Sequence, residues 1–375
     1  MAEGFLHLLP NKDETVESIR DEIRREKLTK RKFQRDFNLS RTRSILGNLN
    51  DNDRVYDEQY VIETTKTLKK KTLPITEYRK LQNALIQNKS HINAFFTVEH
   101  AIKGLCRDLS GTPAQSKLAA ANCSCNISLG DSKACFLLCK FIAPYLISEL
   151  ESTNQPLVEV CAWTIGNLCI GSIKAFSILH AQNCFQSLIN LAKECPVNLL
   201  PAVSYACLRY IHVGITSIDS IDIQQLTQTI VEHIVQISDL DSETLWLLAL
   251  LSANSENITH IVKLVPVIYE YLFQAVFMPD ENIQKISAAL RIICNTTFES
   301  SGYVAHILLK ENSENICQTL DKLLCHQYIH LRNETLWLLG NLLNHNLETV
   351  QRLIKSIVPL LPSIKLALNS FNKTT

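Results

Sequence analysis

Glycine and aromatic residues are scarce in this chain. Only 10 of its 375 residues are glycine and 7 % are aromatic, whereas 46 % are hydrophobic. A sheet protein with many tight turns needs more glycine, because turns with positive φ angles favour that residue. Abundant leucine and isoleucine instead favour stacked helices. The composition therefore predicts an all-α fold.

The chain also lacks a net charge, with 37 Lys and Arg against 37 Asp and Glu. No global field is therefore available to attract nucleic acid or a membrane surface. The charges are unevenly placed, however. Residues 1–80 hold 18 Lys and Arg against 14 Asp and Glu, so this part is positive and the remainder is equally negative. The two parts could attract each other weakly.

No spacing typical of a metal or catalytic site is present. The 13 cysteines include no C-x-x-C pair, and no Cys/His group has the spacing of a zinc site. We interpret them as small buried hydrophobic residues in a reducing compartment. A glycine-rich phosphate loop and the G-x-S-x-G and H-E-x-x-H motifs are missing as well. The sequence therefore predicts no enzyme, no metal and no cofactor.

We expect a soluble protein of the cytoplasm, the nucleus or both. Residues Met1 to Asn11 lack the basic stretch and apolar core of a secretory signal. The most apolar span, Val262 to Met278, is interrupted by polar, charged and helix-breaking residues: Lys263, Pro266, Glu270 and Gln274. It is therefore too polar for a membrane helix, which needs about 20 apolar residues.

A repeat of about 42 residues runs through the chain. Three leucine-rich segments each carry a central tryptophan: VEVCAWTIGNLCIG, SETLWLLALLSAN and NETLWLLGNLLNH. In register with them, the equivalent positions are 122, 163, 206, 246, 291 and 337, at spacings of 41, 43, 40, 45 and 46 residues. Such a period is typical of armadillo or HEAT repeats, whose stacked helices form one continuous core. It predicts a right-handed α-solenoid of about six three-helix repeats.

One face of the third helix in each repeat carries a column of polar and aromatic residues. Trp163 and Asn167 are four residues apart, as are Trp337 and Asn341, so each pair shares one helical face. The same register gives the other members of the column: Asn122, Asn126, Trp246, Arg291 and Asn295. The column lapses in the middle repeats, at Tyr210 and Leu250.

Such a column can bind an extended peptide. An asparagine amide offers two donors and an acceptor, which match the N–H and C=O groups of a peptide backbone. Neighbouring indole rings can form slots for the stems and cationic heads of lysine or arginine. The alternative is that the tryptophans are core residues and the asparagines cap or solvate helices. Asparagines in register on four repeats add weight to the peptide-binding interpretation, and both stay open.

The W-x-x-x-N pairs on the third helix resemble importin alpha, the adaptor that carries cargo with nuclear-localisation signals. In that family the columns line the concave groove that grips basic peptides. Carried over by position, Trp163 with Asn167 and Trp337 with Asn341 match both residues, and other members of the column match one. Importin alpha itself has more repeats and unbroken columns across its main site. The resemblance implies a groove for basic peptides.

A basic segment precedes the repeats. Between Arg20 and Arg43, ten basic residues face four acidic ones, and interleaved apolar residues suggest an amphipathic helix through about Asn38. The segment is a solvated helix or arm, a nucleic-acid tail, a membrane-surface helix or a receptor-binding segment. The acidic residues disfavour nucleic acid. The segment resembles the importin-beta-binding segment of importin alpha, which implies that role for its basic residues: Arg20, Arg24, Arg25, Lys27, Lys30, Arg31, Lys32, Arg35, Arg41 and Arg43.

The chain as a whole is most similar to the transmembrane and coiled-coil domain-containing protein 6 family, a divergent relative of importin alpha. The similarity is carried by the basic helix, the shortened set of repeats, and the motifs at Thr164 to Leu168 and Leu336 to Leu342. The predicted organisation is a basic segment at residues 1–45, a polar linker at 46–75 and the solenoid at 76–375.

Three hypotheses on function follow. The chain is an importin-alpha-like adaptor, whose groove binds basic cargo peptides for nuclear import and whose arm binds importin beta. Alternatively, it is a protein-interaction scaffold whose groove no longer binds nuclear-localisation signals. In the third hypothesis the basic arm lies in its own groove and blocks it, as the opposite charges of the two parts allow. Protein partners are expected and nucleic acid is not.

Overall fold

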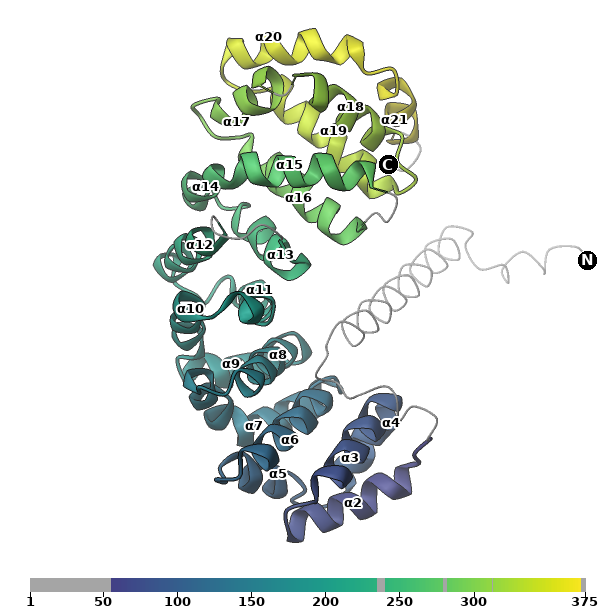
Figure 1. Cartoon of the computed structure of the whole chain (residues 1–375), viewed down its shortest axis with the longest axis vertical. Helices are drawn as coiled ribbons and strands as arrows, with labels where there is room; N and C mark the ends of the chain where they lie inside the picture. The colour runs from purple at the N-terminus through teal and green to yellow at the C-terminus, as the bar shows by residue number, and fades with distance from the viewer. Residues whose placement is uncertain (1–54, 235–239, 279–281, 312, 372–375) are drawn as a thin grey trace, which may run out of the picture.

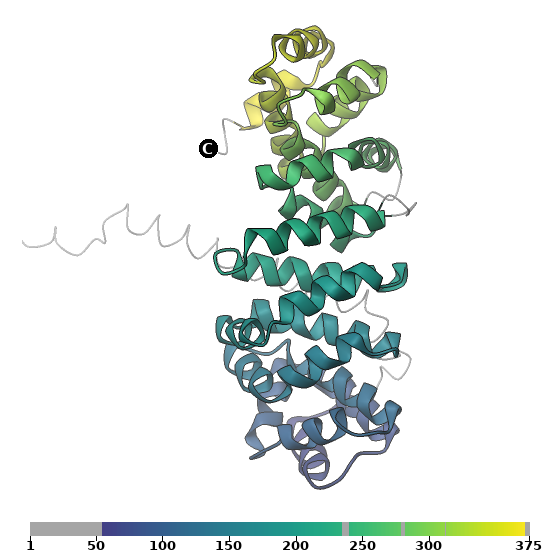
Figure 2. The same ribbon diagram turned by 90° about the vertical axis from the view of Figure 1, so that its left-hand side faces the viewer.

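A computed structural model describes residues 55–234, 240–278, 282–311 and 313–371. Throughout these residues the regular structure is helical, and the helices stack into a curved, elongated arch (Figure 1). In the perpendicular view the helices follow one another as successive rungs along the long axis (Figure 2). The chain is therefore an α-solenoid, as its repeat period predicts.

The inner layer of the arch is a row of helices in which each packs against the next along the chain. The helices α6, α8, α11, α13 and α16 line its concave side (Figure 1). The register of the sequence identifies six members of this row, and the described structure adds α3 before them. The row consists of α3 (Ile75–Gln87), α6 (Ala114–Ile127), α8 (Gln155–Gly171), α11 (Leu200–Gly214), α13 (Ser242–Leu251), α16 (Ile283–Thr296) and α19 (Ile329–Leu343).

A second layer of helices packs against this row. It consists of α2 (Glu58–Lys70), α5 (Ile102–Leu109), α7 (Ser132–Ser148), α10 (Cys184–Glu194), α12 (Ser220–Ile234), α15 (Val265–Phe277), α18 (Ser313–Leu324) and α21 (Ile364–Phe371). Further helices come between members of the two layers along the chain: α4 (Lys89–Thr97), α9 (Ile173–Ala181), α14 (Ser255–Ile261), α17 (Tyr303–His306) and α20 (Glu348–Ile357). Single turns of other helix types lie at Glu149–Glu151, Val197–Leu199, Val262–Leu264, Ile307–Glu311 and Val358–Leu360.

Two repeats have two helices instead of the three that the sequence predicts. The chain passes from α6 to α7 through residues 128–131, and from α11 to α12 through residues 215–219. At the first of these turns the Asp131 carboxylate accepts the Ala134 backbone N–H at 2.8 Å. This N-cap starts the long helix α7 at once, and leaves no residues for a short helix before it.

The predicted linker at residues 46–75 contains a packed helix. In α2, Val61 and Leu68 have no exposed surface, and the helix packs against α4 and α5. The sequence of this segment is polar on average because the outward face of the helix carries several lysines. Its apolar residues nevertheless recur at helical spacing, which allows one face of the helix to be buried. The solenoid therefore begins before residue 76. The basic segment at residues 1–45 and its predicted helix lie outside the described residues.

Small residues form much of the core. Helix α8 is buried on all sides from Val160 to Cys169, because α6, α7, α9 and α11 pack around it. All 13 cysteines are free thiols and ten of them are buried. Burial raises the pKa of the Cys139 thiol to about 12, so this residue packs as a neutral hydrophobe. The interpretation of the cysteines as core residues is confirmed for these ten.

One described helical stretch, Ser255–Phe277, has the length and apolar composition of a membrane-spanning helix. Its second half, α15, buries Val265, Ile268 and Leu272 and packs against α16 and α18. The apolar core helix of a solenoid has the same composition as a membrane span. We interpret this stretch as part of the outer layer.

A buried carboxylate joins the first helices of the solenoid. Asp108, near the end of α5, is 4 % exposed. Its oxygens accept hydrogen bonds from the Tyr78 hydroxyl on α3, from the Thr72 hydroxyl at 2.7 Å, and from Arg107 Nε at 2.7 Å. Burial alone would raise the pKa of Asp108, but these bonds outweigh it and hold the pKa below its usual value. Asp108 is therefore ionised at neutral pH.

Candidate functional site

The asparagines of the predicted column tie successive repeats together. In each case the side-chain amide donates to the inner helix of the preceding repeat or to the residue that follows that helix. Asn126 Nδ2 donates to the Gln82 carbonyl at 3.0 Å, and Asn167 Nδ2 donates to Ser128 Oγ at 2.9 Å. The later repeats follow the same pattern: Asn295 to Ser252 Oγ at 3.0 Å and Asn341 to the Cys294 carbonyl at 3.0 Å.

These bonds leave little of the column open to a ligand. Asn126 is 1 % exposed, Asn167 3 % and Asn341 8 %. Asn167 also uses its carbonyl oxygen, which accepts from the Tyr205 hydroxyl at 2.8 Å. Buried amides that donate to the neighbouring repeat stabilise the stack. Their role as a backbone-binding ladder stays a prediction.

Trp163 lies in a cluster of aromatic and charged side chains on α8 and α11, which we call the Trp163 slot. The residue is 7 % exposed, and the centre of its ring lies 4.5 Å from that of Tyr205 on α11. Glu159 lies one turn earlier on α8 and is half-buried. Its burial raises the pKa of the carboxyl, while the nearby Trp163 side chain acts to lower it. No cation of the described residues pairs with Glu159.

An arginine stacks on the far side of this slot. The Arg209 guanidinium lies 5.0 Å from the centre of the Tyr205 ring, a distance typical of a cation–π contact. In the described part of the chain Arg209 has no acidic partner, and its Nε atom is buried without a hydrogen bond. The slot on α8 and α11 therefore holds a carboxylate that has no cation among the described residues, and an arginine that stacks on an aromatic ring.

The slot around Trp246 is filled by the chain itself. The Trp246 indole donates to Gln284 Oε1 at 3.2 Å. The Arg291 guanidinium lies 5.8 Å from the Trp246 ring centre and forms an ion pair with Glu334 on α19. Arg291 thus occupies the position that a basic side chain of a ligand would need, between an aromatic face and a carboxylate.

The remaining members of the column are unlike each other. Trp337 on α19 is 62 % exposed and is the most accessible of the three tryptophans. Asn122 on α6 is half-buried, and its side-chain oxygen has no hydrogen-bond partner. On the inner face the exposed indole therefore lies on α19, the ring of Trp246 is covered by Arg291, and Glu159 is partly exposed beside the buried Trp163.

Sequence reasoning missed the residues that complete these slots: Glu159, Tyr205, Arg209 and Glu334. Glu159 could have been found, because it lies four residues before Trp163 and so shares its helical face. Tyr205 and Arg209 could not, because they fall outside the register of the column and reach Trp163 only through the packing of α11 on α8. Among the described residues no cluster of His, Cys, Asp and Glu is placed to hold a metal ion.

The chain is similar to importin subunit alpha-9 of Arabidopsis thaliana. The two are 25 % identical over 301 residues, which cover 76 % of this chain and 56 % of that protein. The chain thus spans just over half the length of this curated relative. No family model matches the chain.

Engineered proteins are among the solved structures to which the chain is similar. One engineered protein is 18 % identical and covers 68 % of this chain, and 96 % of its own length is matched, with a TM-score of 0.49. A designed armadillo repeat protein is 16 % identical, with 63 % and 98 % covered and a TM-score of 0.47. A designed armadillo repeat protein in complex with the peptide (KR)4 is 17 % identical, with 68 % and 98 % covered and a TM-score of 0.41. From the two packed layers of helices, the fold of this chain is an armadillo-type α-solenoid.

Proposed function

We propose that the concave face binds an extended peptide with a basic side chain in the slot formed by Glu159, Trp163 and Tyr205. The observation that carries the proposal is the half-buried Glu159 carboxylate, whose pKa is raised by burial and which has no cation among the described residues. A carboxylate withdrawn from water without a cationic partner costs free energy, even when it accepts one hydrogen bond. A lysine or arginine side chain would remove that cost, and its stem would lie against the adjacent aromatic rings.

The wider role that we propose is that of an importin-alpha-like adaptor for protein import into the nucleus. Two features support it: the similarity to importin subunit alpha-9, and the basic segment before the solenoid. In this role the groove binds basic cargo and the segment binds importin beta. The protein then works in the cytoplasm and the nucleus, with other proteins as its partners.

Glu159→Gln tests the slot directly. Glutamine keeps the size of the side chain and an acceptor oxygen for the indole, and removes only the charge. We expect the dissociation constant of a short labelled peptide rich in Lys and Arg to rise about tenfold, because a charge-assisted hydrogen bond is lost. Fluorescence anisotropy measures this change. The matched control is Glu270→Gln on the outer helix α15, which should leave the dissociation constant unchanged.

The pH dependence of this binding follows from the raised pKa of Glu159. The carboxylate form binds the cation, so affinity should be highest above that pKa and should fall as pH is lowered through it. Without peptide, Glu159→Gln should leave the free energy of unfolding unchanged or slightly higher, since burial disfavours the charged form. Equal affinity in the wild type and the Glu159→Gln variant would overturn the assigned slot.

The basic segment has its own test. A pull-down with importin beta should capture the wild-type chain and fail after charge reversal of Arg24, Arg25, Arg31 and Lys32. Binding that survives this charge reversal would exclude the segment as the receptor site. Deletion of residues 1–45 distinguishes receptor binding from autoinhibition. If the segment blocks its own groove, the deletion should raise the affinity of the solenoid for the basic peptide.

The second candidate function is a protein-interaction scaffold that does not read nuclear-localisation signals. Arg291 favours it, because this side chain already fills the Trp246 slot and pairs with Glu334. Recognition of several consecutive basic residues needs such slots to be open.

Arg291→Ala distinguishes the two functions. If the groove binds basic peptides, removal of Arg291 leaves Trp246 and Glu334 free to bind a second cation of the peptide. The affinity for the basic peptide should then rise about fivefold. Arg291→Lys keeps a cation in the slot and should show no such gain. The same anisotropy titration measures both variants. Unchanged weak binding in the Arg291→Ala variant would favour the scaffold.

A further inference from the structure

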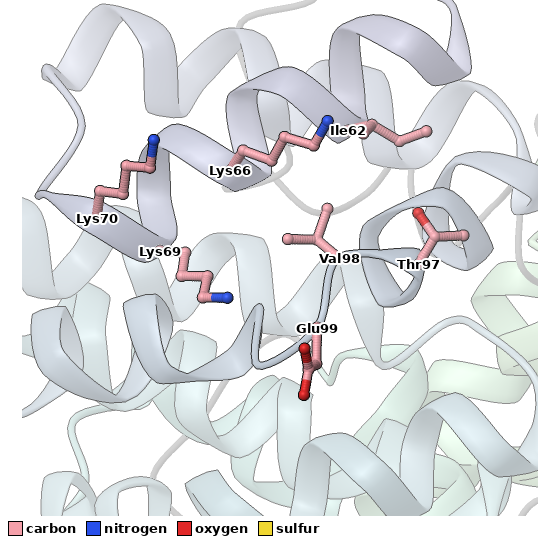
Figure 3. Close-up of a pocket in the computed structure, with 7 residues that line it drawn as sticks. All are labelled: Ile62, Lys66, Lys69, Lys70, Thr97, Val98 and Glu99. Atoms are coloured by element: carbon pink, nitrogen blue, oxygen red, sulfur yellow. The ribbon is translucent and has the colours of Figure 1, made fainter.

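A basic pocket lies at the N-terminal end of the solenoid, away from the column on the inner helices. Its volume is about 460 Å³. Three lysines of α2 form one side, and the segment that follows α4 forms the other (Figure 3). The lining residues are Ile62, Lys66, Lys69, Lys70, Thr97, Val98 and Glu99.

The positive charge of the pocket is not neutralised within the described structure. Lys66, Lys69 and Lys70 are exposed, and none of the three forms an ion pair with a carboxylate of the described residues. Lys66 and Lys70 are one turn apart, so they repel each other. The nearby end of α2 favours cations through its carbonyl groups, which offsets part of this repulsion. A bound anionic ligand would offset the remaining repulsion between the lysines.

The close packing of α5 on α2 adds a further cation to this surface. A Cβ atom at Gly104 would lie only 2.6 Å from the Leu68 carbonyl oxygen, so the two helices touch there. Lys103 precedes that glycine and is exposed. Lys71 follows the last residue of α2 and is also exposed. Lys71 and Lys103 do not line the pocket themselves, but they are neighbours in the chain of Lys70 and of the α2–α5 contact at Gly104.

The floor of the pocket is apolar, which distinguishes it from a simple charged surface. Ile62 is half-buried and packs against the core, and Val98 also lines the pocket (Figure 3). The Thr97 hydroxyl donates to the Ala94 carbonyl at 2.7 Å, so its oxygen can still accept a hydrogen bond. Glu99 lies at the rim, with its side chain 82 % exposed and 3.2 Å from His100 Nε2.

We propose that this pocket docks a short acidic segment of a partner protein, in which Asp or Glu residues flank one aliphatic side chain. The acidic side chains pair with the three lysines, and the aliphatic side chain lies on Ile62 and Val98. From Ile62 to Lys70 the helix advances about 12 Å, which matches about four residues of extended chain. The surface is thus of the right length for a linear peptide motif.

A peptide fits this surface better than a nucleic acid does. Nucleic-acid binding relies on many phosphate contacts along a basic track, whereas this pocket offers three lysines around an apolar floor. The Glu99 carboxylate at the rim can accept a backbone N–H of a peptide, a donor that a nucleic-acid backbone lacks. The proposal is independent of the basic-peptide slot at Glu159, since the two sites differ in position and in the charge they select.

Fluorescence anisotropy with the whole chain tests the proposal. The probe is a labelled Glu-Glu-Leu-Glu-Glu peptide, and binding should weaken steeply with salt. The triple variant Lys66→Gln, Lys69→Gln, Lys70→Gln should lose about tenfold in affinity. A control with the same change in charge, Lys193→Gln, Lys263→Gln, Lys355→Gln, should stay within about twofold of the wild type. All six lysines are exposed, so the fold should tolerate both variants.

Two further probes separate the parts of the proposal. Replacing the leucine of the peptide by serine should lower the affinity about fivefold, because the contact with the apolar floor is lost. A single-stranded oligonucleotide of equal charge should bind more weakly than the peptide. The proposal is overturned if the two triple variants bind alike, if the leucine has no effect, or if the oligonucleotide binds as tightly as the peptide.

Discussion

Replacing Asp108 by alanine should lower the free energy of unfolding by about 3 kcal/mol. The substitution leaves the Tyr78 and Thr72 hydroxyls without their acceptor and removes the carboxylate that pairs with Arg107. Tyr78 has no exposed surface, so water cannot replace the lost bond. Urea unfolding at neutral pH measures the change. Asp131→Ala removes only the N-cap of α7 and should lower the free energy of unfolding by about 1 kcal/mol, so it serves as a comparison for the larger loss at Asp108.

The same carboxylate predicts how stability depends on pH. The pKa of Asp108 is lowered in the folded protein, so its contribution is fully present above the pKa of an unfolded aspartate and is lost as pH falls through the lower folded value. The difference in stability between the wild type and the Asp108→Ala variant should therefore shrink in acid. A difference that stays constant down to the lowest pH at which the protein folds would contradict the role of ionised Asp108.

Gly166→Ala should lower the free energy of unfolding by about 2 kcal/mol, although alanine is normally the better helix former. A Cβ atom at Gly166 would lie 2.5 Å from a ring carbon of Tyr205 and 3.3 Å from the Ala206 Cα atom. The ring cannot move freely, because its hydroxyl donates to Asn167 and its face packs on Trp163. The substitution should therefore push α11 away from α8 and weaken binding of the basic peptide as well.

The chain contains a matched control for this prediction. Gly340 precedes Asn341 as Gly166 precedes Asn167, but no atom lies within 4 Å of the position that its Cβ would take. Gly340→Ala should therefore raise the free energy of unfolding by up to about 1 kcal/mol through helix propensity. Thermal and urea unfolding of both variants give the comparison. Two changes of the same sign would show that the contact with Tyr205 is not what requires glycine at position 166.

The repeat period predicted the architecture because each inner helix repeats the same pattern of buried residues. The tryptophans at 163, 246 and 337 mark equivalent places on α8, α13 and α19, and register alone located the helices between them. The same reasoning missed α3, which carries neither a tryptophan nor an asparagine of the column. It also left α2 in the linker, because the lysines of its outer face concealed its buried residues.

The candidate site was harder to predict, because its chemistry arises between repeats. The spacing placed Asn167 on the face of Trp163, but its partners Ser128 and Tyr205 lie 39 and 38 residues away in the chain. Likewise, Arg291 was identified as a member of the column, whereas its contacts with Trp246 and Glu334 depend on how α13, α16 and α19 pack. A single sequence does not contain these pairings.

The central claim is that Glu159 holds one cation of an extended peptide. A double-mutant cycle tests it most directly, combining Glu159→Gln with replacement of each Lys or Arg of the peptide by an uncharged residue of similar length. Calorimetric titration should reveal one peptide position whose replacement couples to Glu159→Gln by about 1 to 2 kcal/mol, with the other positions near zero. Coupling near zero at every position would contradict the claim.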